Sequence, residues 1–217
     1  MIHFRPFKNI IGGFCEKDSK VHSPQIQNFV LLKQVHGDQI HVLDSGAQKD
    51  SVHLQEGDAL LCFEKNIPIA VKTADCVPIL LAHPDGLIGA VHAGWRGTRL
   101  KILKKVLIKI RDEFKKDLSK IHLAIGPAIC GKCYEVGEEV AREFDSKYFI
   151  QNSNGKFLLN LKKLNFDMAI QAGIPQTQIQ VMEDCTLCKP EIYHSYRYES
   201  QHGLSKEGRN YSWVMLE

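Results

Sequence analysis

Short apolar runs rich in β-branched residues recur along this chain between turn-forming residues, and this pattern constrains the fold most. Each run has the length of a strand rather than of a helix, and several lack polar alternation, as is typical of strands buried on both faces of a sheet. We therefore predict strands over residues 29–32, 59–63, 67–71, 77–82, 87–91, 121–125, 178–182 and 212–216.

Helical periodicity appears between these runs. The segment 98–116 carries an apolar stripe along one helix face, with Thr98 as a candidate N-cap. A second helix is expected over 135–144, and a third from the candidate cap Asn160 to Gly173. Strands and helices mix without strict alternation, which predicts an α/β (α+β) fold with a mixed β-sheet core and flanking helices.

The composition is that of a soluble globular protein. Of the 217 residues, 44% are hydrophobic and 24% are charged, and no apolar run is long enough to span a bilayer. Because no linker or repeat divides the chain, we expect one layered domain over residues 1–217. The first ten residues lack the apolar core of a signal peptide, so a cytoplasmic location without membrane association is expected.

The charge pattern does not indicate a nucleic-acid partner. The net charge is only +3, although residues 96–116 carry nine basic and two acidic side chains. No aromatic residues interleave with these basic residues in the manner of nucleic-acid motifs. We therefore interpret this stretch as the solvated face of an amphipathic helix.

Seven cysteines and ten histidines make metal chemistry the first hypothesis to test. In a reducing compartment, cysteines serve as metal ligands, catalytic groups or buried small side chains more often than as disulfides. His36, Cys76 and His92 each lie near a predicted strand end beside small residues. Ligand sites of α/β proteins are commonly built at strand ends.

Residue types alone leave three interpretations of these side chains open. Two imidazoles and a thiolate suit a catalytic zinc with an open fourth position. The separations of 40 and 16 residues match no compact zinc-finger spacing. His36, His92 and Cys76 could equally be ordinary surface or core residues, or Cys76 could be a nucleophile with His92 as its base.

Two C-x-x-C pairs compete for a metal: Cys130 with Cys133, and Cys185 with Cys188. Two such pairs can hold a structural zinc, and a redox role is a further alternative. However, 51 residues separate Cys133 from Cys185, far more than a zinc-ribbon loop contains. We therefore expect separate structural thiols rather than one four-cysteine site.

Several short motifs in a fixed order then point to a known family. They are Lys-Gln-Val-His-Gly at 33–37, Thr-Ala-Asp-Cys at 73–76, Val-His-Ala-Gly-Trp-Arg-Gly at 91–97, Ile-Gly-Pro-Ala-Ile at 125–129, Cys-Tyr-Glu-Val-Gly at 133–137 and Ser-Tyr-Arg at 195–197. Together they closely resemble the YfiH family, also called the laccase-domain or polyphenol oxidase family. The resemblance runs from about residue 28 to the C-terminus and implies a layered α/β fold.

The resemblance implies a metal and an activity. It assigns zinc to His36, Cys76 and His92. It also implies phosphorolysis of adenosine, inosine and methylthioadenosine, with adenosine deamination as an additional activity, so the expected partners are a purine nucleoside and phosphate. Copper is disfavoured, because multicopper clusters depend on repeated His-x-His pairs and this sequence contains none.

Phosphorolysis requires an anion site, for which arginine is well suited because its planar donors bind two oxygens at once. Asp75 is a candidate acid or base, although we favour a role as the carboxylate partner of a metal-bound histidine. The candidate substrate- and phosphate-binding residues are Lys33, Gln34, Arg96, Arg197 and Arg209.

The C-terminal segment departs from the family pattern. Tyr198 stands where a second arginine usually follows Ser-Tyr-Arg, and Glu207 stands where the family usually has threonine before Gly-Arg. Substrate preference could therefore differ from that of the family. The metal ligands are unaffected.

Other classes of function remain open from sequence. A cysteine hydrolase using Cys76 and His92, acting on peptidoglycan precursors, would not need zinc. A non-enzymatic zinc-binding protein would bind metal without turnover.

Overall fold

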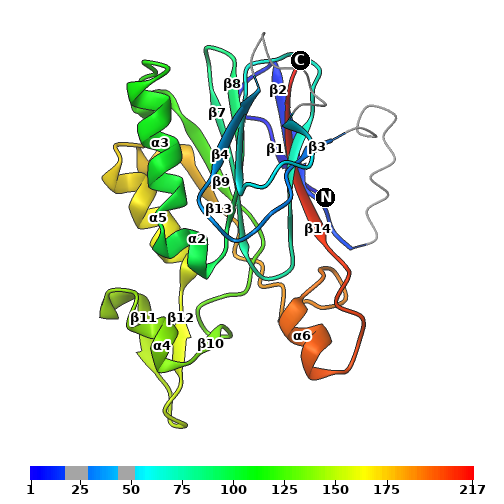
Figure 1. Ribbon diagram of the computed structural model, residues 1–217, viewed down its shortest axis with the longest axis vertical. Helices are drawn as coiled ribbons and strands as arrows, with labels where there is room; N and C mark the ends of the chain where they lie inside the picture. The colour runs from blue at the N-terminus through cyan, green and yellow to red at the C-terminus, as the bar shows by residue number, and fades with distance from the viewer. Residues whose placement is uncertain (18–28, 44–51) are drawn as a thin grey trace.

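The computed structural model describes residues 1–17, 29–43 and 52–217. Three layers lie side by side in the main body: helices, a six-stranded sheet and a five-stranded sheet (Figure 1). A smaller three-stranded sheet extends from one end, below the helices in the view of Figure 1. The expected α/β fold is confirmed, but the mixed core consists of two facing sheets rather than one.

The six-stranded sheet is the central layer, with the order β13-β9-β7-β8-β5-β4. Strands β9, β7, β8 and β5 pair antiparallel, whereas β13 and β4 each add a parallel strand at an edge. Its strands are β4 (Ile40–Leu43), β5 (Ala59–Cys62), β7 (Val77–His83), β8 (Leu87–Ala93), β9 (His122–Ile125) and β13 (Ile179–Val181).

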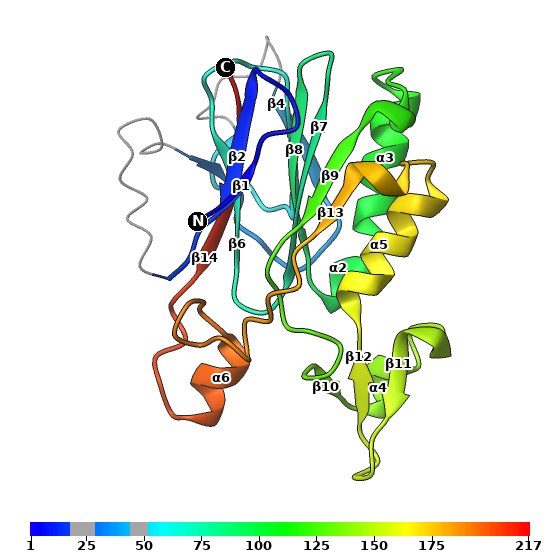
Figure 2. The ribbon, with the colours of Figure 1, turned by 180° about the vertical axis from the view of Figure 1, so that it is seen from behind.

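The five-stranded sheet has the order β1-β2-β14-β6-β3 and contains both ends of the chain (Figure 2). The C-terminal strand β14 lies in the middle, antiparallel to β2 and β6. Its strands are β1 (Ile2–Phe4), β2 (Ile10–Phe14), β3 (Val30–Leu31), β6 (Ile69–Thr73) and β14 (Asn210–Leu216).

The central sheet is buried on both faces, which explains its uninterrupted apolar runs. In β7, Ile79 and Leu81 belong to the core that faces the helices, whereas Leu80 and Ala82 belong to the core between the two sheets. All four side chains are fully buried. Side chains alternate across a strand, so both sets must be apolar when neither face meets water.

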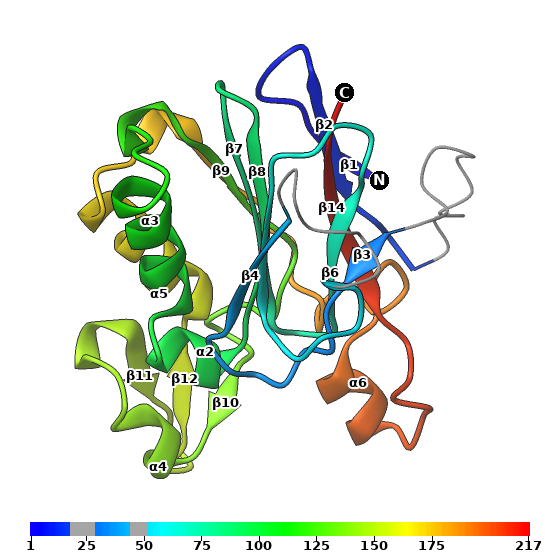
Figure 3. The same cartoon turned by 45° about the horizontal axis from the view of Figure 1, so that its top comes forward.

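The helical layer consists of α2 (Trp95–Arg99), α3 (Ile102–Asp112) and α5 (Leu161–Gln171), which cover one face of the central sheet (Figure 3). The predicted helix over 98–116 is therefore two helices. Lys101 separates them in a left-handed conformation with φ 61°. Thr98 lies inside α2 and is not an N-cap, whereas the predicted cap Asn160 accepts a hydrogen bond from the backbone N–H of Lys163.

The basic stripe of α2 and α3 is largely paired with acidic side chains. Its ion pairs join Arg99 to Glu143, Lys105 to Asp38, Lys109 to Glu113, Arg111 to Asp112 and Lys116 to Asp85. Much of the stripe's charge is therefore balanced locally, which agrees with a solvated helix face.

The prediction of one helix over 135–144 is wrong in part. The residues Glu135–Val136 form β10, and only α4 (Glu138–Ala141) is helical. The small sheet has the order β10-β12-β11, with β11 (Phe149–Gln151) and β12 (Phe157–Leu159). The last helix, α6 (Tyr196–Gln201), lies apart from the helical layer at the same end of the molecule (Figures 1 and 2).

Each predicted strand overlaps an observed strand. The strands that sequence analysis missed are β1, β2, β4, β10, β11 and β12. Within the described part of the chain, no helix is long and apolar enough to cross a membrane.

Candidate metal centre and substrate cavity

The side chains of His36, Cys76 and His92 converge on one point. Their ligand atoms lie within 4.8 Å of one another, although the residues come from three separate segments. Cys76 directly precedes β7 and His92 lies near the end of β8; these antiparallel strands pair Pro78 with His92, which brings the two ligands together. His36 lies in the loop after β3, and its ring meets that of His92 edge to face at 4.8 Å.

A buried carboxylate fixes this arrangement. Asp58, fully buried just before β5, accepts a 2.7 Å hydrogen bond from Nδ1 of His92. It also accepts hydrogen bonds from the backbone N–H groups of Val35 (3.2 Å), His36 (3.0 Å) and Gly37 (2.7 Å). One carboxylate thus orients one histidine and holds the loop that carries the other.

Sequence analysis missed Asp58 and favoured Asp75 as the carboxylate partner of a metal-bound histidine. Asp58 makes that contact with His92, whereas the hydrogen bonds found for the Asp75 carboxylate come from Thr186 and Arg197. The sequence does contain a sign of this role, because Asp58 directly precedes the apolar run at 59–63. A carboxylate buried beside such a run requires hydrogen-bond partners.

The electrostatics favour a thiolate at Cys76. Burial raises the pKa of Cys76, but the charges and hydrogen bonds of His92 and His36 outweigh this effect and lower it to about 6. Burial lowers the pKa of His92, yet Cys76 and Asp58 raise it to about 9. Burial raises the pKa of Asp58 as well, but hydrogen bonds from His92 and Gly37 bring it below its usual value.

The space between the three ligands fits a metal ion. A Cβ atom at Gly94 would lie 3.0 Å from Sγ of Cys76, 3.2 Å from Cδ2 of His36 and 3.7 Å from Nε2 of His92. Any side chain larger than glycine would therefore fill this space. Because Nδ1 of His92 is bonded to Asp58, its Nε2 is left for the ion, as in other histidine ligands with a carboxylate partner.

These ligands lie in the wall of a cavity of about 760 Å³, large enough for a nucleoside. Every residue that sequence analysis singled out for the site lines this cavity. They are Lys33, Gln34, His36, Asp75, Cys76, His92, Arg96, Arg197 and Arg209. The cavity also contains aromatic and aliphatic side chains that sequence analysis had not assigned to it: Trp95, Tyr134, Tyr196, Leu161 and Ile129.

Two of the candidate binding residues already have protein partners. Lys33 forms an exposed 2.9 Å ion pair with Glu56. The side-chain amide of Gln34 donates to the backbone carbonyl of Lys72 and accepts from its N–H, both at 2.8 Å. Gln34 therefore holds its loop against β6. These contacts of Lys33 and Gln34 are structural and do not by themselves indicate substrate binding.

The three candidate arginines differ in how firmly they are held. Arg197 donates to the backbone carbonyl of Glu135 at 3.0 Å, and its guanidinium lies 5.7 Å from the ring centroid of Tyr134. The Arg96 guanidinium lies over the ring of Trp95. Arg209 donates to backbone carbonyls within its own loop.

Asp75 connects the candidate metal ligand Cys76 to the C-terminal part of the cavity. Its backbone has φ 85°, a left-handed conformation that is costly for a residue other than glycine. One carboxylate oxygen accepts from Oγ1 of Thr186 at 2.6 Å, and the other accepts from the backbone N–H of Arg197 at 2.7 Å. These contacts fix where Arg197 begins to project from α6.

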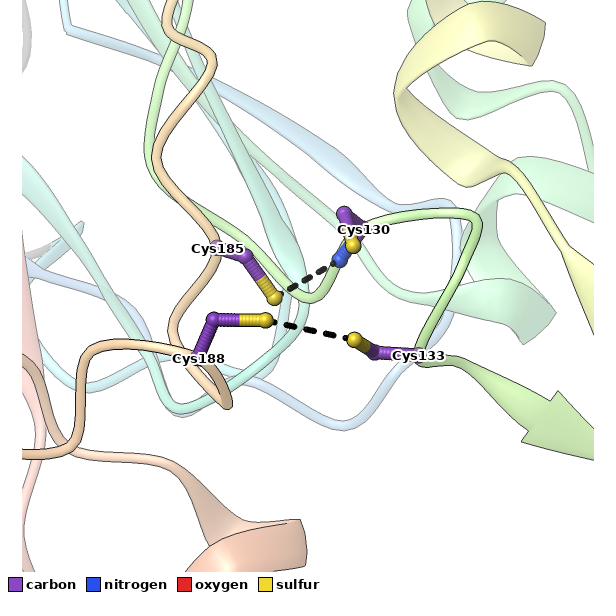
Figure 4. A group of neighbouring side chains, drawn as sticks. All are labelled: Cys130, Cys133, Cys185 and Cys188. Carbon is purple, nitrogen blue, oxygen red and sulfur yellow. Dashed lines mark hydrogen bonds between the residues drawn. The ribbon is translucent and has the colours of Figure 1, made fainter.

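The four cysteines of the C-x-x-C pairs form a second cluster. Their sulfur atoms also lie within 4.8 Å of one another, so the expectation of separate thiols is wrong (Figure 4). The segment between Cys133 and Cys185 forms the small sheet, α5 and β13, and it ends beside the point where it began. Sequence spacing alone could not show this.

Fold and site define an α/β protein whose cavity wall contains a cluster of two histidines and one cysteine that could hold a metal ion. A family model described as multi-copper polyphenol oxidoreductase laccase matches residues 17–217, and the chain belongs to this family. The matched structure of the Bacillus licheniformis hypothetical protein YfiH has a TM-score of 0.85 and 26% sequence identity, and the match covers 96% of this chain and 93% of that chain.

Relatives with assigned activities carry two names. A purine nucleoside phosphorylase of Aquifex aeolicus is 40% identical over 149 residues, 69% of this chain and 68% of the relative. The adenosine deaminase RL5 of an unknown prokaryotic organism is 32% identical over 185 residues, 79% of this chain and 70% of the relative. Neither name specifies a metal.

The role of Asp58 can be tested by the substitution Asp58→Asn. We expect zinc affinity to fall by about 10- to 100-fold, because carboxylate partners of ligating histidines typically contribute that much. Competition with a chromogenic chelator measures the affinity, and Asp112→Asn, which removes an exposed carboxylate, is the control. Unchanged affinity in a folded Asp58→Asn protein would contradict this role.

Proposed function

We propose that this protein is a zinc-dependent purine nucleoside phosphorylase acting on adenosine, inosine and methylthioadenosine, with adenosine deamination as a second activity. The observation that carries the proposal is the convergence of His36, Cys76 and His92 in a cavity that also contains arginines and aromatic rings. The names of the relatives support the same substrate class.

His36, Cys76 and His92 would hold the zinc ion, which with three protein ligands could accept a further oxygen ligand. When bound there, zinc supplies Lewis-acid polarisation of a phosphate or water oxygen. The donor set of two imidazoles and one thiolate suits zinc, and the sequence has none of the His-x-His pairs that a multicopper cluster would need.

The remaining steps belong to the cavity side chains. Arg96 and Arg197 bind phosphate and balance its charge, while the rings of Tyr134 and Trp95 offer apolar faces to the purine. A phosphate oxygen attacks the anomeric carbon as the glycosidic bond breaks. The departing base takes the bonding electron pair and a proton relayed through water, and the phosphate gives up its own proton to that water as it becomes the sugar ester. Asp75 acts by positioning Arg197 rather than through direct proton transfer.

Incubation of the zinc-loaded protein with adenosine and phosphate tests the proposal directly. We expect release of adenine and ribose 1-phosphate, resolved by chromatography. Arg96→Ala should reduce kcat/KM for phosphate by about 10- to 100-fold, the size expected for a lost hydrogen bond to a charged group.

The matched control is Arg99→Ala on the same helix, since Arg99 is paired with Glu143 and is not among the residues lining the cavity. No base release from any of the three nucleosides, with zinc loaded, would overturn the phosphorylase proposal. Inosine and ammonia formed from adenosine without phosphate would report the deaminase activity.

A second candidate, a cysteine hydrolase, is favoured by one observation: the thiolate of Cys76 beside the imidazolium of His92 is also how a catalytic nucleophile is activated. Such an enzyme would act without zinc. Protection of Cys76 by zinc distinguishes the two functions.

In zinc-stripped protein, we expect alkylation of Cys76 by iodoacetamide to rise through about pH 6 and level off above it, because the thiolate is the reactive form. Cys62, whose pKa burial raises to about 11, serves as the internal control. Peptide mass spectrometry measures both. Zinc loading should suppress alkylation of Cys76; an equal rate with and without zinc would favour the hydrolase.

A further inference from the structure

The four cysteines outside the cavity wall form a compact cluster from two distant segments. Cys130 and Cys133 lie in the turn between β9 and β10, and Cys185 and Cys188 lie between β13 and α6 (Figure 4). Sγ of Cys133 lies 3.3 Å from Sγ of Cys188, and the backbone N–H of Cys130 donates to Sγ of Cys185 at 3.3 Å.

Sheet topology brings these segments together. Strands β9 and β13 are parallel neighbours in register, so the chain leaves both at the same end of the sheet. Hydrogen bonds between the two departing segments continue this pairing, from Ala128 N–H to Asp184 and from Thr186 N–H to Ala128. The two C-x-x-C turns therefore face each other on a rigid base.

We propose that these four cysteines bind a structural zinc ion, separate from the one assigned to the cavity. A tetrahedral zinc with Zn–S bonds of about 2.3 Å places its sulfurs about 3.8 Å apart. The four sulfurs already lie within 4.8 Å of one another, so small rotations of the side chains reach that geometry.

Backbone geometry around the sulfurs supports a metal site. In the first turn, the N–H groups of Cys133 and Tyr134 both donate to the carbonyl of Cys130 at 2.9 Å. In the second turn, the N–H of Lys189 donates to the carbonyl of Cys185 at 3.1 Å. Each pair is thus held in a tight turn with its two sulfurs on the same side, as zinc-binding C-x-x-C pairs require.

A buried positive charge lies beside the cluster. The ammonium of Lys162, on the mostly buried first turn of α5, donates to the carbonyls of Met182 (2.6 Å) and Asp184 (2.7 Å), directly before Cys185. A zinc ion with four thiolates has a net charge of −2, which a nearby cation stabilises. Cys188 is exposed and gives the ion a route of entry.

Zinc at this point would join two loops that shape the cavity. Tyr134 follows Cys133 and lines the cavity; Thr186 follows Cys185 and donates its hydroxyl to Asp75. The backbone N–H of Ile129, before Cys130, donates to the carbonyl of Asp75 at 3.1 Å. The ion would therefore hold one wall of the cavity in place from behind, without contacting the substrate.

Metal binding in a Cys76→Ala background tests this proposal independently of the cavity site. After reduction and loading with cobalt(II) alone, the full-length Cys76→Ala protein should bind one equivalent and show the intense thiolate charge-transfer bands of a four-sulfur site. Adding Cys188→Ser should remove or shift these bands, whereas adding Cys62→Ala, at a buried thiol outside the cluster, should leave them unchanged.

Cadmium-113 NMR of the otherwise unchanged chain covers the case in which a cysteine variant does not fold. We expect two resonances, one at the low-field position typical of four thiolate ligands. A Cys76→Ala protein that binds no cobalt, or a Cys133–Cys188 disulfide that persists after reduction and prevents metal binding, would overturn the proposal. Loss of phosphorolysis with the four-sulfur signal intact would count against the proposed function alone.

Discussion

The buried carboxylate of Asp58 is the interaction on which the candidate metal centre depends. It lies where the central sheet meets the loop after β3, and it accepts hydrogen bonds from one ligand's ring and from the backbone of the other ligand's loop. A charge buried this deeply is stable only when its lone pairs are satisfied. The ring of His92 and three backbone N–H groups satisfy it. The same four hydrogen bonds that stabilise the buried charge therefore also set the positions of the two histidines.

The two facing sheets explain why the site can be so well defined. Strands β7 and β8 are buried on both faces, so the ends from which Cys76 and His92 project are fixed by packing on either side. His36 lies in a loop outside the sheets, and the Asp58 hydrogen bonds to the backbone of this loop hold it in place. The core thus places Cys76 and His92, while Asp58 orients the ring of His92 and holds the loop of His36.

Much of the central sheet could be predicted from sequence, since a strand buried on both faces leaves an apolar run that no other element explains. Strand β1 was missed because it has only three residues, and β2 was missed because Gly12 and Gly13 weaken its strand signal. The break at Lys101 was missed because helical periodicity continues across it. The spacing of apolar residues does not reveal a change of backbone conformation at a single residue such as Lys101.

For the candidate site too, the sequence predicts which residues take part but not how they contact one another. All nine candidate side chains line one cavity, because most of the motifs that carry them lie at strand ends and the motif with Arg197 begins α6, which Asp75 contacts. What they could not supply were contacts between motifs: Asp58 with His92, Thr186 with Asp75, and the meeting of two C-x-x-C turns across 51 residues. These contacts depend on the pairing of β5 with β8, of β7 with β9 and of β9 with β13.

We propose above that His36, Cys76 and His92 bind a zinc ion at the wall of the cavity. An anomalous difference map from a crystal of the zinc-loaded protein, recorded on both sides of the zinc absorption edge, tests it most directly. We expect a peak at bonding distance from all three side chains, about 2.0–2.3 Å. A map with no peak among them, in a crystal that contains zinc elsewhere, would contradict it.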